Sequence, residues 1–202
     1  YFNKKIIYLD GYYQHPDFFY DSINYIEKWY RSNNNILDKT IEQTTIHLRR
    51  ADYINHGWDL PLNYYINSLE KIDPDRKYKI KIISDDYFAA IGLENICSKM
   101  GFEIIENSNF DDKQNFTEIV NSKNIIMSNS SFSWWASTLS EKIYNIENRF
   151  ITYPKGWLSG FNDVLGNDHW ITIDSNNSNA RKENYGNSLE FYTKQNQNKL
   201  EI

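Results

Sequence analysis

The sequence predicts an α/β fold, with a Rossmann-like parallel sheet that carries helices on both faces. Apolar runs of strand length alternate with segments of helical periodicity, which is typical of parallel strands joined by crossover helices. Polar residues follow several of these runs, as expected where strands end at the edge of an open sheet. We expect a leading segment at residues 1–39, the α/β domain at residues 40–174, and a polar tail or peripheral helix at residues 175–202.

Six segments have the length and composition of buried strands. They are Lys5–Leu9, Thr44–Leu48, Lys79–Ile83, Phe102–Ile105, Asn124–Met127 and Arg149–Tyr153.

Helical periodicity fills the gaps between these strands. Apolar residues recur at i, i+3, i+4 and i+7 from Leu62, with Pro61 at the expected helix start. A second stripe begins at Ala89 and closes at Gly101, which suits a helix C-terminus. Shorter or earlier helices are expected around Phe116 and over Pro16–Tyr30. The clearest stripe is formed by Phe132, Trp135, Ala136, Leu139 and Ile143.

Composition excludes several classes of protein. The 202 residues carry a net charge of −5, so no nucleic-acid-binding surface is indicated. One cysteine, Cys97, allows no internal disulfide. No apolar stretch reaches the roughly 20 residues that span a bilayer. We expect a cytoplasmic protein, and peripheral association with the inner face of the cell membrane is compatible with these properties.

The segment His47–Tyr53 follows the strand that ends at Leu48. Arg49 and Arg50 can present forked donors to phosphate oxygens, and His47 could donate to the same phosphates or to a sugar hydroxyl. Asp52 could orient an arginine or accept a proton. The structural alternative is that the arginines pair with surface carboxylates and that His47 is a hydrogen-bonded residue at a strand end.

Two further polar segments follow predicted strands. Ser84, Asp85 and Asp86 could cap the next helix, which is the usual role of such residues, or accept hydrogen bonds from a guanine or ribose edge. The second segment comprises Asn129 and four residues after it, which lead into the strongest predicted helix and place backbone N–H groups and hydroxyls where a diphosphate could bind. Its members are Asn129, Ser130, Ser131, Phe132 and Ser133.

Two more residues are candidates for ligand contact. Trp134 lies off the apolar stripe, so it packs elsewhere or stacks on a ligand, whereas Trp135 lies on the stripe and is expected in the core. Lys155, in the sequence Tyr153–Trp157, could add a charge for a phosphate, although Pro154 and Gly156 favour an ordinary turn.

Several of these segments resemble the motifs of the alpha-1,2-fucosyltransferases. The string His47-Leu-Arg-Arg-Ala-Asp-Tyr53 is similar to that family's H-x-R-R-x-D-Y motif, and Asn129-Ser-Ser-Phe-Ser-Trp-Trp135 is similar to its N-S-S-F-S-W-W motif. Ser84-Asp-Asp86 stands between them in the family order. Leu9-Asp-Gly-Tyr-Tyr-Gln14 and Pro154-Lys-Gly-Trp157 resemble two further family segments.

The resemblance implies a two-Rossmann (GT-B type) enzyme that transfers L-fucose from GDP-fucose to the 2-hydroxyl of a galactoside glycan, with inversion and without a metal or other cofactor. Arg50 or Arg49 would neutralise the leaving diphosphate. We favour Arg50, with Asp52 as a weaker candidate for the general base. The family's G-x-G-N-Q segment is absent, so we expect residues 1–39 to link to an N-terminal acceptor domain that this sequence lacks. The alternatives are a fucosyltransferase of another linkage and a non-catalytic GDP-sugar-binding module.

Overall fold

The computed structural model describes residues 21–106, 111–144, 147, 149–157 and 168–175. Its centre is a six-stranded sheet in which every strand pairs with its neighbours in parallel, in the order β3-β2-β1-β4-β5-β6. The strands are β1 (Ile41–Leu48), β2 (Lys79–Ser84), β3 (Ile104–Ile105), β4 (Ser122–Ile126), β5 (Ile151–Lys155) and β6 (Ile171–Asp174). This order is that of a doubly wound Rossmann sheet, and it reverses between β1 and β4.

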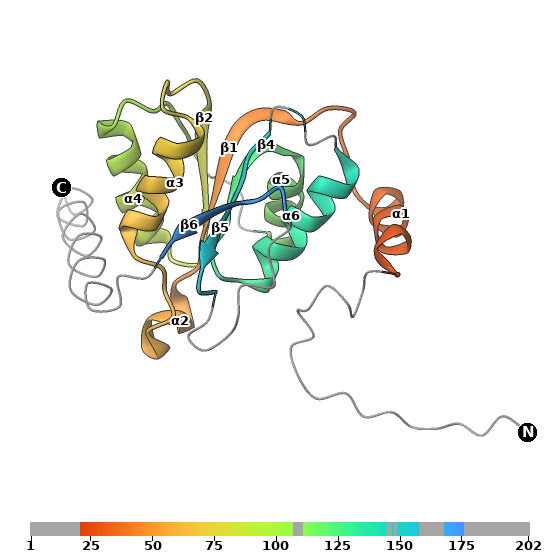
Figure 1. The fold of residues 1–202 in the computed structure, drawn as a ribbon, viewed down its shortest axis with the longest axis horizontal. Coiled ribbons are helices and arrows are strands. Elements are labelled where there is room, and N and C mark those ends of the chain that lie inside the picture. Colours follow the sequence, from red (N-terminus) through yellow and green to blue (C-terminus); the bar gives the residue numbers. More distant parts are fainter. Residues whose placement is uncertain (1–20, 107–110, 145–146, 148, 158–167, 176–202) are drawn as a thin grey trace, which may run out of the picture.

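Helices cover both faces of the sheet (Figure 1). The helices α3 (Leu62–Ile72) and α4 (Tyr87–Lys99) lie on one face, and α5 (Asp112–Asn121) and α6 (Ser131–Ile143) lie on the other. The helix α1 (Ile23–Asn33) packs on the outside of α6, and the short α2 (Ala51–His56) follows β1 directly. The predicted α/β class, with a parallel sheet between two helical layers, is therefore confirmed.

The sheet separates two hydrophobic cores, because alternating side chains of its central strands point to opposite faces. Ile46 and Leu48 of β1 pack with the side chains of α3 and α4, whereas Ile125 and Met127, at the end of β4, pack with those of α5 and α6. Successive residues of a strand point to opposite faces, so His47, between Ile46 and Leu48, faces the α5 and α6 side. This parity decides which residues at the end of β1 can meet the start of α6.

Helix boundaries follow local signals. Pro61 precedes α3 as expected. Asp86 caps α4, because its side chain accepts a hydrogen bond from the backbone N–H of Ala89 at 3.0 Å. At the other end of α4, Gly101 adopts a φ of 93°, a left-handed conformation that favours glycine and ends the helix.

The structure differs from the predicted elements at several points. The strand β6 was not predicted. It forms the edge of the sheet, and its residues alternate between half-buried and exposed, so it has no buried apolar run. The strand β5 continues through Pro154, where a proline had suggested a turn. The helix α1 extends to Asn33, beyond the expected end at Tyr30, and α2 was not predicted. Lys5–Leu9 and the beginning of Pro16–Tyr30 lie outside the described residues.

Candidate functional site

The three polar segments that follow β1, β2 and β4 lie at one edge of the sheet. Leu48 of β1 pairs in register with Ser84 of β2, and Ile46 pairs with Ile126 near the end of β4. The residues after these positions therefore emerge side by side at the carboxyl edge. Since the sheet order reverses between β1 and β4, this is the place where doubly wound sheets bind their ligands.

Arg49 is held between two carboxylates. Its Nη1 lies 2.6 Å from Oδ2 of Asp85, and its Nη2 lies 2.6 Å from Oδ1 of Asp52. The guanidinium carbon is 5.2 Å from the centre of the Tyr53 ring. One third of the side chain remains exposed. The guanidinium is thus fixed in orientation and still accessible to a ligand.

Arg50 occupies a different environment. Its side chain is only 6% exposed, and its Nε lies 3.4 Å from Oδ2 of Asp86. Its backbone N–H donates to Oδ1 of Asp85 at 2.8 Å. The accessible arginine is therefore Arg49, whereas Arg50 was favoured from the sequence as the residue that neutralises the diphosphate. The reason is strand parity: Arg49 continues the face of His47, whereas Arg50 begins the turn into α2.

The acidic residues act mainly as structural braces. Asp85 joins the ends of β1 and β2, because its carboxylate accepts hydrogen bonds from the backbone of Arg50 and Ala51 and pairs with Arg49. Asp86 caps α4 while its own N–H donates to Oγ of Ser84 at 3.0 Å. Asp52 is 56% exposed and pairs with Arg49. For Asp52 and Asp86, the structure supports the bracing and capping alternatives raised from sequence.

His47 is buried and neutral. Its Nδ1 forms a 2.8 Å hydrogen bond with Oγ of Ser128, and its ring centre lies 5.3 Å from that of Phe132. Burial, followed by the nearby charge of Arg49, lowers the pKa of His47 to about 3. The imidazole therefore carries no charge at neutral pH and can contribute hydrogen bonds rather than a cation. Ser128 is fully buried and was not among the residues expected at the site.

The serine-rich segment builds a tightly bonded start to α6. Oγ of Ser130 accepts a hydrogen bond from the N–H of Phe132 at 3.3 Å, and Oγ of Ser133 donates to the carbonyls of Ser128 and Ser130, each at 3.2 Å. Ser131 is exposed. Because these contacts fix the turn, the positive end of the α6 dipole is directed at the carboxyl edge.

Asn129 ties this turn to its surroundings. Its Nδ2 donates to the carbonyl of Trp58 at 2.7 Å and to that of Trp157 at 3.1 Å, while Tyr53 Oη donates to its backbone carbonyl at 3.2 Å. The side chain is 3% exposed. Asn129 thus connects the motif after β4 to the segment after α2, and its amide nitrogen is engaged within the protein.

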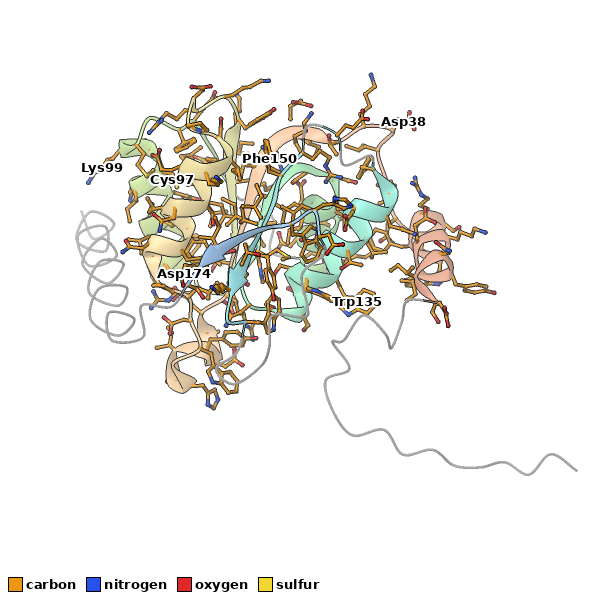
Figure 2. All side chains as sticks on the ribbon, viewed as in Figure 1. Asp38, Cys97, Lys99, Trp135, Phe150 and Asp174 are labelled. Atoms are coloured by element: carbon orange, nitrogen blue, oxygen red, sulfur yellow. The ribbon has the colours of Figure 1, made fainter. Side chains whose placement is uncertain are left out.

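The burial of the two tryptophans differs from the expectation. Trp134 is 2% exposed and packs in the core with Leu139 and Tyr153, so its proposed contact with a ligand is corrected. Trp135, labelled in Figure 2, is half-buried, and it lines a cavity together with Trp29 of α1. The apolar stripe was misjudged because small residues such as Ser137 and Ser140, both fully buried, also face the interior and widen the buried face of α6.

A cavity of about 140 Å³ opens at this edge. It lies between the ends of β1 and β2 and the first turns of α5 and α6. Its wall includes His47, Arg49, Ser84, Asp85, Asn115 and Phe132. Lys155 is exposed at the end of β5 and is not part of this wall. Asn115, together with Asp112 three residues before it, comes from α5. No motif was recognised in the sequence of this helix.

Other features of the described residues lie away from this edge. A larger hollow, of about 1010 Å³, lies between the segment after α1 and the outer side of α5. The described residues contain no group of three or more His, Cys, Asp or Glu side chains placed to hold a metal ion. None of the described helices is both long and apolar enough to cross a bilayer.

A parallel sheet in this order, with helices on both faces and an arginine and a helix start beside a cavity at its switch point, defines a Rossmann-type α/β domain. Residues 1–149 match the model of glycosyl transferase family 11, the alpha-1,2-fucosyltransferase family. The chain therefore belongs to this family, which confirms the resemblance seen in its motifs.

One curated relative and one solved structure illustrate these similarities. The chain is 28% identical over 149 residues to the O-antigen biosynthesis glycosyltransferase WbnK of Escherichia coli, over 68% of this chain and 47% of WbnK. It thus spans about half the length of this relative. The crystal structure of POFUT1 in complex with GDP-fucose matches with a TM-score of 0.39 and 10% identity, covering 76% of this chain and 46% of POFUT1.

Proposed function

We propose that this chain is the donor-binding part of a GT-B fucosyltransferase, and that part of GDP-fucose binds in the cavity at the carboxyl edge. The accessible guanidinium of Arg49 beside that cavity carries the proposal, together with membership of glycosyl transferase family 11. In this proposal residues 40–174 bind the donor and residues 1–39 lead from an acceptor-binding domain. The reaction is transfer of L-fucose to the 2-hydroxyl of a galactoside, with inversion.

The charged groups at the site suit a leaving diphosphate. Arg49 is oriented by Asp85 and Asp52, so its fork can reach phosphate oxygens without first being ordered. The first turn of α6 adds partial positive charge at the same edge. Both groups gain interaction energy as negative charge develops on the departing GDP, which is the condition for accelerating transfer. We propose that they do so without a metal ion.

The biological setting is proposed from the curated relative. WbnK is an O-antigen biosynthesis glycosyltransferase, and we propose that this chain also acts in the synthesis of a surface glycan, in the cytoplasm and in peripheral contact with the inner face of the membrane. The acceptor would be a glycan that contains a galactoside.

Isothermal titration calorimetry of this chain with GDP, GDP-fucose, UDP-galactose and inorganic pyrophosphate tests the donor site. We expect GDP and GDP-fucose to bind, UDP-galactose to bind at least tenfold more weakly, and EDTA to change none of these affinities. Loss of GDP binding in EDTA would refute the metal-independent part of the proposal. Absence of GDP and pyrophosphate binding would refute the donor site itself.

A further inference from the structure

Asn115 contributes a buried amide oxygen to the wall of the cavity. The residue lies near the start of α5 and is 8% exposed. Among the described residues, no hydrogen-bond donor reaches its Oδ1. Buried polar atoms in proteins nearly always have a partner. An acceptor without one, beside a cavity, is therefore placed to receive a hydrogen bond from a ligand.

The position of Asn115 in α5 is one where an apolar side chain would be expected. Ile119, one turn later on the same face, is fully buried in the core, whereas the adjacent Phe116 packs sideways against Phe132 and Tyr30. A leucine or alanine at position 115 would leave no acceptor unsatisfied. The amide does not serve the packing of this face, and it lies where α5 meets the cavity.

The wall of the cavity carries groups of both charges. Arg49, which is paired with Asp85 of the same wall, and the first turn of α6 suit phosphates. Asp112 and Asn115, three residues apart on α5, line the same cavity and offer a carboxylate and an amide oxygen. Both are hydrogen-bond acceptors, and the carboxylate would repel a phosphate. The α5 side of the wall therefore suits the part of a ligand that carries N–H donors.

A guanine base carries such donors. Its N1–H and its N2 amino group lie next to each other on one edge, whereas adenine has an acceptor nitrogen at position 1. We propose that Asn115 determines the base specificity of the site, with its Oδ1 accepting a hydrogen bond from this edge of guanine while the diphosphate lies near Arg49. This inference rests on the proposed function, in which the cavity binds part of GDP-fucose.

The test compares nucleotide preference in the wild type and in three variants by calorimetry with GDP, ADP and pyrophosphate. In Asn115→Ala we expect GDP affinity to fall about tenfold, the size of one hydrogen bond, with ADP and pyrophosphate affinities unchanged. Asn115→Asp retains an acceptor and should keep the preference for GDP. Gln114→Ala removes an exposed amide from the same helix and should behave as the wild type.

Three results would overturn the inference. If the wild type binds neither GDP nor pyrophosphate, the inference falls together with the proposed function. If it binds GDP but Asn115→Ala keeps the same ratio of GDP to ADP affinity, the proposed function stands and the role of Asn115 is wrong. If Asn115→Ala weakens GDP, ADP and pyrophosphate equally, the residue supports the fold or the phosphate end. Thermal unfolding of each variant confirms that the proteins compared are folded.

Discussion

Nη1 of Arg49 lies 2.6 Å from Oδ2 of Asp85, and this ion pair joins the motif after β1 to the motif after β2. The same carboxylate accepts hydrogen bonds from the backbone N–H groups of Arg50 and Ala51. One acidic side chain therefore fixes both the turn that follows β1 and the guanidinium that emerges from it. In the proposed donor site, this contact pre-organises the cation that meets the diphosphate.

The structure predicts that Arg49 matters more than Arg50 for binding GDP. Arg49→Lys keeps the charge but loses the planar fork, so we expect GDP affinity to fall about ten- to hundred-fold, equivalent to about 1.5–3 kcal/mol. Arg50→Lys is the matched control: its side chain is buried beside Asp86, so we expect lower thermal stability and less than about a threefold change in affinity. Calorimetry and thermal unfolding measure both. Equal losses of affinity in the two variants would contradict this assignment.

Asp52→Asn distinguishes bracing from general-base catalysis. Asp52 is more than half exposed and forms an ion pair with Arg49, and exposed ion pairs of this kind contribute about 0–1 kcal/mol. If Asp52 only braces Arg49, the rate of fucose transfer should fall less than about fivefold. Loss of a general base would instead cost about 10²–10⁴-fold. Steady-state kinetics with saturating donor, in a protein that includes the proposed acceptor-binding domain, decides between them, and a loss in the larger range would make Asp52 catalytic.

His47 gives the protein a pH-dependent stability. Its pKa is about 3 in the folded chain because the ring is buried, whereas an unfolded chain titrates near the ordinary value of about 6.5. Between these values the unfolded state binds one more proton, so acid favours unfolding. As pH falls from about 6.5 toward 3, this residue should lower the free energy of unfolding by up to about 1.4 kcal/mol per pH unit.

Urea unfolding of the wild type and His47→Gln at several pH values measures this effect. The variant should show a smaller loss of stability between pH 6.5 and 4.5, and above pH 7 the two slopes should coincide. His56→Gln removes an exposed imidazole that stacks on Trp58 and serves as a control for the change of residue type. Identical slopes for the wild type and His47→Gln would show that His47 is not held neutral by burial.

Substitutions of the two tryptophans of α6 should differ in their effect on the free energy of unfolding. Trp134→Ala removes a large core side chain, and we expect a loss of about 3–5 kcal/mol in the free energy of unfolding. Trp135→Ala, at a half-buried position beside α1, should cost less than half of that. Chemical denaturation measures both. If Trp135→Ala proved the more destabilising, the assignment of Trp134 to the core would be wrong.

Much of the fold and part of the site were predictable from local patterns. Buried strands such as Lys79–Ile83 and the stripe that begins at Leu62 have periodicities set by the geometry of a strand and a helix, and the structure shows both nearly as expected. Residues such as Asp86 indicate the start of a helix by their type and by their position after a strand. The site was predicted at one edge of the sheet because the carboxyl ends of parallel strands lie at the same edge.

The sequence by itself determined the α/β class, the family and the three strand-end motifs, since these depend on residue order and spacing alone. Only the tertiary structure decided that Arg49 is accessible while Arg50 is buried, that His47 bonds to Ser128, and that Asn115 reaches the cavity. Each of these depends on which side chains from distant segments share a face, and on how burial removes water from them. Contacts across 81 residues, as between His47 and Ser128, leave no periodic signal in the chain.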